Sequence, residues 1–295
     1  MQFTIFQESR RGARRSNQDR LAYCYSRDAL LMLVADGMGG HLRGEMAAEI
    51  AAQFVAEAFR REARPRLADA CAFLRESLLG AHREIVRSAA ESGLPETPRT
   101  TCIVCIVQDG AAHWAHAGDS RLYHIRQGRI LAQTKDHSLV QQLIDSGRMR
   151  EESVAAHPER NRIFNCLGSQ QPPRVDLCGP TALDAGDTLM LCSDGLWGPL
   201  SGKRIASALL QQGVMQAVPE LLDEAERRAG RECDNLSVIA VTWEGNSPAS
   251  RTAAAASGQS KDEPKMQSEY LSDEEIESAI ARIRNAIKGQ RDERS

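Results

Sequence analysis

The stretch TCIVCIVQDGAAHWAHAGDSRLYHIRQGRILAQ, residues 101–133, indicates how this chain folds. It contains four short apolar runs, at 101–107, 111–117, 121–126 and 129–133. The dipeptides Asp109-Gly110 and Gln127-Gly128 supply turns between them, and short runs bounded by such turns are typical of β-strands. Connections this short favour antiparallel pairing, because parallel strands need a long crossover.

Blocks of strands and helices continue on both sides of this stretch. Before it, the sequence predicts strands within 1–35 and helices at 44–63 and 67–92. After it, the sequence predicts helices at 138–146, 202–212 and 215–229, and strands at 175–178, 188–193 and 237–243. Because strands and helices do not alternate strictly, a doubly wound parallel sheet is disfavoured. We predict an α+β fold, a four-layer αββα sandwich of two antiparallel sheets flanked by helices.

The composition is that of an ordinary globular protein. The 295 residues carry a formal net charge of −3, whereas a general nucleic-acid binder is usually basic, so no nucleic-acid partner is expected. No apolar run approaches the ~18 residues that indicate a membrane helix. The first 15 residues lack the apolar middle of a secretory signal. We therefore expect a cytoplasmic protein without membrane contact.

Eight cysteines are scattered along the chain, and only Cys102 and Cys105 form a CxxC pair. The pair lies in a predicted strand, where a spacing of three places the side chains on opposite faces. A zinc site would want a second CxxC, which is absent. These cysteines are interpreted as buried structural residues, and His116 and His124 as sheet or surface residues.

The composition changes after the last predicted strand. We predict a domain over 1–244, a flexible Ser-, Ala- and Gly-rich linker over 245–270 and an amphipathic helix over 271–290. Ser272 and Glu275 form a capping box at the start of that helix. Its apolar stripe consists of Ile276, Ile280, Ile283 and Ile287. Two interpretations stay open: the helix docks on its own domain, or it binds a partner.

Four aspartates lie beside glycine or a small polar residue at one end of an apolar run. They are Asp36 in VADG, Asp119 in AGDSR, Asp194 in LCSDG and Asp234 in CDN. One such aspartate is ordinary turn chemistry, but four predict carboxylates gathered at one edge. Clustered carboxylates repel one another, and hard cations such as Mg²⁺ or Mn²⁺ relieve the repulsion. Arg14 adds a group that binds phosphate in a bidentate manner, so the set predicts a phosphoryl-transfer centre.

These residues lie in six strings that resemble the metal-dependent protein serine/threonine phosphatases of the PP2C type, in their compact bacterial form. The strings are Arg14-Arg-Ser-Asn-Gln-Asp19, Asp36-Gly-Met-Gly-Gly-His41 with Gly44-Glu45, Gly118-Asp-Ser-Arg121, Asp136-His-Ser138, Ser193-Asp-Gly-Leu-Trp197 and Asp234-Asn235. Each string is moderately specific by itself, whereas all six in this order are highly specific. The resemblance implies a central β-sandwich flanked by helices, in agreement with the pattern.

The resemblance also implies a metal centre of two Mn²⁺ or Mg²⁺ ions with a possible third. Asp36 would bridge the first two ions, and Gly37 would offer its backbone carbonyl to the second. Asp194 and Asp234 would hold the first ion. Asp119 would bind a third, looser ion.

Two further residues complete the implied active site. Arg14 would grip the substrate phosphate, and Asp19 would orient the water. The implied mechanism is direct hydrolysis by a water that bridges two ions, without a phosphoenzyme. Residues 148–174 correspond to a mobile flap beside the site.

Two positions depart from the family pattern. Gln18 stands where the family often has glutamate, which removes a charge near the second ion. Met38 stands where some members have a histidine proposed as general acid. Whether His41 replaces that histidine is left open by the sequence.

The expected substrates are phosphorylated cytoplasmic proteins, including a serine/threonine kinase or its forkhead-associated partner. A resemblance to phosphatases paired with kinases in type VI secretion is a weaker indication. Two other functions remain as alternatives. One is a catalytically silent binding module of the same fold, and the other is another metal hydrolase, such as a phosphodiesterase or a nuclease.

Overall fold

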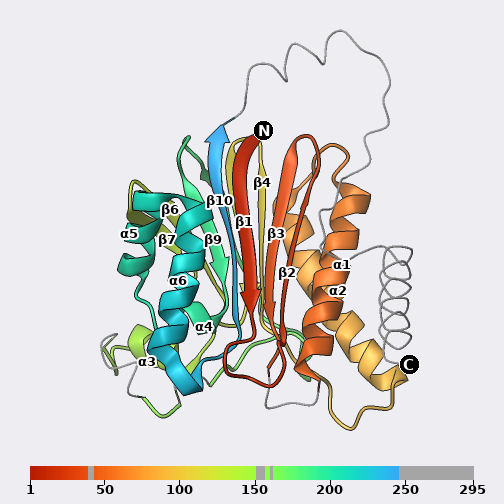
Figure 1. Ribbon diagram of the computed structural model, residues 1–295. Coiled ribbons are helices and arrows are strands. Elements are labelled where there is room, and N and C mark those ends of the chain that lie inside the picture. Colours follow the sequence, from red (N-terminus) through yellow and green to blue (C-terminus); the bar gives the residue numbers. More distant parts are fainter. Residues whose placement is uncertain (39–42, 151–156, 160–161, 246–295) are drawn as a thin grey trace, which may run out of the picture. The chain divides into compact units, whose positions relative to one another are not determined.

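The computed structural model describes residues 1–38, 43–150, 157–159 and 162–245, and within them two five-stranded antiparallel sheets lie together (Figure 1). The first sheet has the order β1 (Gln2–Arg10), β10 (Leu236–Gly245), β9 (Thr188–Cys192), β6 (Arg121–Arg126) and β7 (Arg129–Gln133). The second has the order β2 (Asp19–Tyr25), β3 (Ala29–Asp36), β4 (Cys102–Gln108), β5 (Ala111–Ala117) and β8 (Asp176–Ala182). The predicted α+β fold is confirmed.

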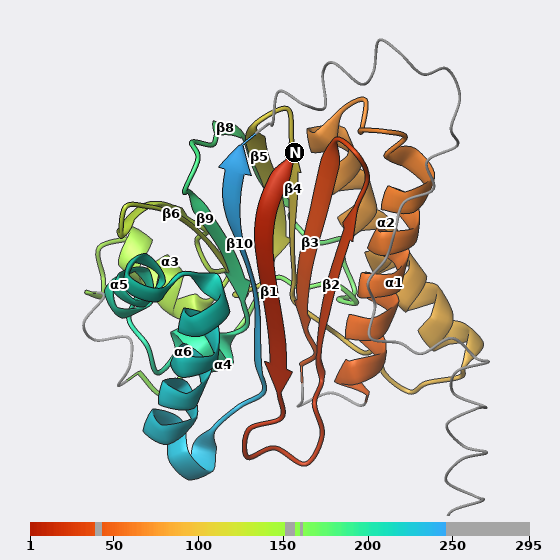
Figure 2. The same ribbon diagram turned by 45° about the horizontal axis from the view of Figure 1, so that its top comes forward.

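Helices cover the outer face of each sheet. The second sheet is covered by α1 (Gly44–Glu62) and α2 (Ala70–Glu91). The first sheet is covered by α5 (Gly202–Gln212) and α6 (Val214–Ala229), and the short helices α3 (Leu139–Asp145) and α4 (Asp194–Trp197) lie in connections. Figure 2 shows the two helix pairs on opposite sides of the strands. None of the helices in this part of the chain has the length and apolar character needed to cross a membrane.

Three apolar cores hold the four layers together. The residues of β3 are buried with alternating direction, because successive side chains on a strand point to opposite faces. Met32 and Val34 enter the core between the sheets, whereas Leu31 and Leu33 pack under α1 and α2. A strand buried on both faces explains why this segment is a continuous apolar run rather than an alternating one.

The cysteine prediction is confirmed by the same alternation. Cys102 belongs to the core beneath the helices and Cys105 to the core between the sheets. Both thiols are free, and burial raises the pKa of Cys102 to about 12. These cysteines are therefore packing residues.

The chain passes from one sheet to the other immediately after β5. The pairs β4–β5 and β6–β7 are antiparallel hairpins, as the turns predict, but β5 and β6 belong to different sheets. Gly118 makes this crossing with φ of +116°, and a Cβ at this residue would lie 2.5 Å from Cβ of Thr101. The crossing places Asp119 where the ends of the two sheets meet.

The C-terminal predictions fall outside the described residues. Apart from Gly245, which ends β10, this is true of the linker predicted over 245–270 and the whole helix predicted over 271–290. His41 and parts of the 148–174 segment also lie outside them.

Candidate metal centre

Five aspartates from both sheets come together at one end of the sandwich. Asp36 ends β3, and Asp19, directly opposite it in the strand register, begins β2. Asp119 lies in the sheet-crossing turn, Asp194 begins α4 after β9, and Asp234 precedes β10. The structure thus brings together the five aspartates predicted from the sequence, although the strands that carry them are far apart in the chain.

The carboxylates perturb one another strongly. Burial, reinforced by repulsion from Asp19 and Asp194, holds the pKa of Asp36 well above its usual range. Burial raises the pKa of Asp194 to about 7, with a further contribution from Asp234. Burial also raises the pKa of Asp19 to about 6, although Ser193 donates a 2.8 Å hydrogen bond to its Oδ2 atom. By itself, the cluster binds protons at a pH where an isolated carboxyl group is ionised.

Two oxygen atoms show that this cluster fits a cation. Oδ1 of Asp19 and Oδ1 of Asp119 are buried and have no hydrogen-bond partner within the described part of the chain. Buried polar atoms without partners are rare and costly. A hard divalent ion prefers carboxylate and carbonyl oxygens, which are the groups gathered here. The residues present therefore suit Mg²⁺ or Mn²⁺.

Gly37, directly after Asp36, has no room for a side chain. A Cβ there would lie 2.5 Å from the backbone carbon and oxygen of Gly44 and 2.7 Å from the carbonyl oxygen of Gln18. Its N–H donates a 3.2 Å hydrogen bond to that same carbonyl of Gln18. Glycine is required because the end of β3, the start of β2 and the start of α1 converge at this residue.

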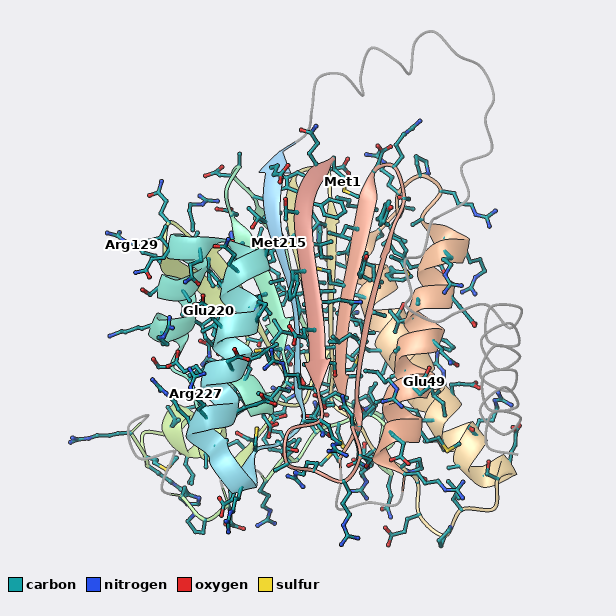
Figure 3. The ribbon with its side chains drawn as sticks, viewed as in Figure 1. Met1, Glu49, Arg129, Met215, Glu220 and Arg227 are labelled. Atoms are coloured by element: carbon teal, nitrogen blue, oxygen red, sulfur yellow. The ribbon has the colours of Figure 1, made fainter. Side chains whose placement is uncertain are left out.

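The segment before β2 is fastened to the start of β10 by Asn235. Its side-chain amide donates to the carbonyls of Arg11 and Ser16 at 2.8 and 3.0 Å, and its Oδ1 accepts from the N–H of Gln18 at 2.9 Å. The start of β2 is tied to α1, because Arg20 of β2 forms an ion pair with Glu49, which is labelled in Figure 3. These bonds hold the loop that carries Arg14 at the edge of the carboxylate cluster.

Arg14 lies against the cluster rather than apart from it. Its Nη2 atom is 2.6 Å from Oδ2 of Asp234, and 54% of its side chain is exposed. The neighbouring Arg15 is exposed. A guanidinium that reaches the carboxylates from the solvent side is well placed to meet a phosphate group there.

Gln18, which stands where the family often has glutamate, forms a hydrogen bond to the first turn of α1. Its Nε2 donates a 2.9 Å hydrogen bond to Oε2 of Glu45, and this bond lowers the pKa of Glu45. Glu45 therefore supplies a carboxylate beside the position where the family often has one. Met38, at the other departure, carries no group able to donate a proton.

Sequence reasoning missed the support beneath Asp119. Nε1 of Trp197 donates a 3.0 Å hydrogen bond to the backbone oxygen of Asp119. The guanidinium of Arg121 lies 3.6 Å from the centre of the Trp197 ring and makes two 2.8 Å hydrogen bonds to Asp136. The indole of Trp197 packs against the core, and it also fixes the sheet-crossing turn.

Comparisons with known proteins agree on one family. The sequence model described as Protein phosphatase 2C matches residues 7–227. A putative protein phosphatase 2C-type from Streptococcus pyogenes serotype M6 is 30% identical over 230 residues, which are 77% of this chain and 92% of that protein.

Solved structures show the same likeness. The catalytic domain of the serine threonine protein phosphatase PstP, in complex with two manganese ions, matches with a TM-score of 0.69 and 29% identity, over 82% of this chain and 99% of that chain. PppA, described as a key regulatory component of T6SS in Pseudomonas aeruginosa, matches with a TM-score of 0.66 and 26% identity, over 81% and 97%. The family match therefore covers four of the five aspartates, and Asp234 lies just beyond it.

Proposed function

This chain belongs to the protein phosphatase 2C family, and we propose that it uses two Mn²⁺ or Mg²⁺ ions to hydrolyse phosphoserine and phosphothreonine in proteins. The family and the serine/threonine phosphatase activity named for its relatives support the reaction class. The observation that carries the metal dependence is the group of five aspartates, two of which hold a buried oxygen without a hydrogen-bond partner among the described residues.

The proposed ion sites are those that the resemblance to the family implies. Asp36 and the carbonyl of Gly37 would hold the second ion, with Asp36 shared between the two. Asp194 and Asp234 would hold the first, and Asp119 a third, looser one. Bound ions supply two effects: they lower the pKa of water and neutralise the charge of the phosphate.

The remaining steps belong to the side chains. Asp19 keeps Oδ2 on the hydroxyl of Ser193 and leaves Oδ1 free to accept a hydrogen bond from the attacking water. Arg14 would leave Asp234 and form a bidentate contact with the phosphate oxygens, where it stabilises the charge that develops during transfer. Water loses a proton and attacks phosphorus while the bond to the serine or threonine oxygen breaks; the leaving oxygen takes up a proton from solvent, so the products are inorganic phosphate and the free hydroxyl side chain. The thiol of Cys192 does not compete as nucleophile, because it is fully buried and its pKa is raised.

The proposal extends to the substrates, the opposing kinase and the location of the protein. Phosphorylated proteins are the substrates, and a serine/threonine kinase or its forkhead-associated partner is the expected counterpart. The likeness to PppA, described as a key regulatory component of T6SS, is the observation that supports a role in T6SS regulation. We further propose a cytoplasmic location, and a partner-binding role for the helix predicted over 271–290.

The decisive experiment compares wild type with Asp36→Asn on p-nitrophenyl phosphate and on a phosphothreonine peptide, with Mn²⁺ and with EDTA. We expect wild-type activity that requires Mn²⁺ and is lost by at least about 100-fold in the variant, since one bridging carboxylate charge is removed. Asp28→Asn, in the turn between β2 and β3, is the matched control and should retain activity. A folded wild type without activity in excess Mn²⁺ would favour a binding module, and cleavage of single-stranded DNA would favour a nuclease.

A further inference from the structure

A buried imidazole lies directly behind the turn that carries Asp119. His137 is 1% exposed, and its Nδ1 accepts a 3.1 Å hydrogen bond from the N–H of Gly118. The backbone N–H of His137 donates in turn to the backbone carbonyl of Gly118 at 2.9 Å. The residue before Asp119 is thus held twice by one histidine.

The same histidine also contacts Phe164 and Asn165. Nδ2 of Asn165 lies 2.6 Å from Nδ1 of His137, and the N–H of Phe164 donates to the carbonyl of His137 at 3.1 Å. Asn165 is fixed in this orientation, since it accepts from the N–H of Arg174 and donates to the carbonyl of Arg174. His137 therefore connects the Asp119 turn with Phe164 and Asn165.

These contacts determine which ring nitrogen carries the proton. Nδ1 of His137 faces two N–H groups, from Gly118 and Asn165, so it must present its lone pair. The proton then resides on Nε2, which lies 3.2 Å from Oδ2 of Asp176. Burial lowers the pKa of His137, in keeping with a neutral ring. The imidazole thus accepts a hydrogen bond from Gly118 on one side and faces the carboxylate of Asp176 on the other, although Nε2 makes no hydrogen bond of good geometry within the described residues.

His116, His137 and Asp176 could also form a second metal centre, because their ligand atoms lie within 4.8 Å of one another. A metal ion on Nε2 of His137 would displace the proton from that atom. Since Nδ1 already acts as an acceptor, the ring would become an imidazolate anion, which is costly in a buried site. His116 stacks on His137 with ring centres 4.6 Å apart and lies with its own Nε2 2.8 Å from the carbonyl of Lys135. The hydrogen bonds therefore favour a structural pair.

We propose that His137 is a positioning residue for the weakest metal site, which it shapes by accepting a hydrogen bond from Gly118 and thereby orienting Asp119. Asn165 extends this support to Arg174, and the carboxylate of Asp176 faces Nε2 of the ring at 3.2 Å. The inference rests on the proposed role of Asp119 in holding a third ion. His137 itself touches neither substrate nor metal.

Two substitutions separate the two sides of the ring. In His137→Asn the amide oxygen can take the place of Nδ1 and still accept from Gly118, but the link to Asp176 is lost. In His137→Gln the longer amide can reach the place of Nε2 and still donate to Asp176, while the N–H of Gly118 loses its acceptor. A buried N–H without a partner is expected to weaken the weakest Mn²⁺ site about tenfold or more in His137→Gln, whereas His137→Asn should stay within about threefold of wild type.

Isothermal titration calorimetry of the metal-free full chain with Mn²⁺ measures this directly, and the Mn²⁺ dependence of p-nitrophenyl phosphate hydrolysis gives a second readout. The two tighter sites should keep wild-type affinity in both variants. His124→Asn is the control. It removes another buried histidine, whose Nε2 is 2.8 Å from Oδ2 of Asp187 and which does not contact the five aspartates of the metal centre. It should lower thermal stability without changing the titration.

Equal affinity of the weakest site in His137→Asn and His137→Gln would overturn the proposal, as would a wild type that shows no third site. If His137→Gln does not fold, Asp176→Ala replaces it. Without this carboxylate the imidazole can carry its proton on Nδ1 and stop accepting from Gly118, which the amide oxygen of His137→Asn cannot do, so Asp176→Ala should weaken the same site alone, and an unchanged titration would also overturn the proposal. Loss of all Mn²⁺-dependent hydrolysis in the wild type would instead contradict the proposed function.

Discussion

Arg14 and Asp234 form an ion pair across 220 residues of sequence, with Nη2 of the arginine 2.6 Å from Oδ2 of the aspartate. The pair joins the residue proposed to bind phosphate with one proposed to bind metal. Because the arginine side chain is 54% exposed, the pair itself contributes little stability. A cation at Asp234 would compete with Arg14 for the carboxylate and release the guanidinium toward a phosphate.

Arg14→Ala is therefore expected to impair substrate binding and not metal binding. A charge-assisted contact with phosphate is lost in both the bound substrate and the transition state, so kcat/KM for a phosphothreonine peptide should fall by about 10- to 100-fold, through KM and kcat together. Arg14→Lys should recover part of the loss, because a lysine keeps the charge but not the bidentate geometry. Steady-state kinetics at saturating Mn²⁺ measures both.

Arg15→Ala is the matched control for this change and should behave as wild type. Calorimetric Mn²⁺ affinity in Arg14→Ala should be equal to wild type or tighter, since a competitor for Asp234 is removed. Weaker Mn²⁺ binding would show instead that Arg14 supports the shape of the metal site.

The raised pKa values of the cluster predict how pH acts on the metal-free protein. Asp194 and Asp19 have a pKa of about 7 and about 6, against an ordinary 3.8. Protonation is thus favoured in the folded state. Their stabilising contribution is complete below the ordinary value and is lost as pH rises through 6 to 7.

Thermal unfolding in EDTA and in Mn²⁺ between about pH 5 and pH 8 tests this expectation. Mn²⁺ replaces protons on the same oxygens, so the rise in Tm that it causes should grow with pH. Asp194→Asn should remove part of the pH dependence seen in EDTA. A rise in Tm that is independent of pH would mean that these carboxylates are already ionised in the metal-free fold.

Local patterns in the sequence were sufficient for the layers of the fold. The apolar run of β3 and the turns at Asp109-Gly110 and Gln127-Gly128 depend on nearest neighbours, and they predict strands and hairpins correctly. The passage from β5 to β6 was not predictable in this way. Which sheet a strand joins is decided by pairing with distant strands, such as β6 with β9.

The candidate site shows the same division. Asp36 and Asp194 were predicted from their place at strand ends, and the structure places them together. The residues that hold the turn of Asp119 were not predicted. The contact of Trp197 with Asp119 and that of His137 with Asp176 join segments that share no local sequence pattern. The sequence did contain one signal for these supports. Arg121 and Asp136 are charged residues next to apolar strands, and such residues are expected to pair with each other when they are buried.

Gly37→Ala should disable the metal centre through backbone geometry. The new methyl group would collide with backbone atoms of Gly44 and Gln18, which cannot move without separating α1 from β2. We expect a lower Tm and loss of Mn²⁺-dependent hydrolysis, measured by thermal unfolding and p-nitrophenyl phosphate assay. Gly202→Ala is the control, because its nearest contact is only the terminal Cδ1 of Ile130, which can rotate away. Normal activity in Gly37→Ala would contradict the proposed role of its carbonyl.

Truncation can separate the catalytic domain from the segment that follows it. Strand β10 pairs with both β1 and β9, and its Trp243 is buried between the sheets, so the fold needs every residue through Gly245. A chain that ends after Gly245 should keep its Tm and its hydrolysis of p-nitrophenyl phosphate. A chain that ends after Asn235 should fail to fold, because it lacks β10. If the first truncation also abolishes hydrolysis of this small ester, residues 246–295 are part of the fold, and the proposed partner-binding role of the helix predicted over 271–290 has to be abandoned.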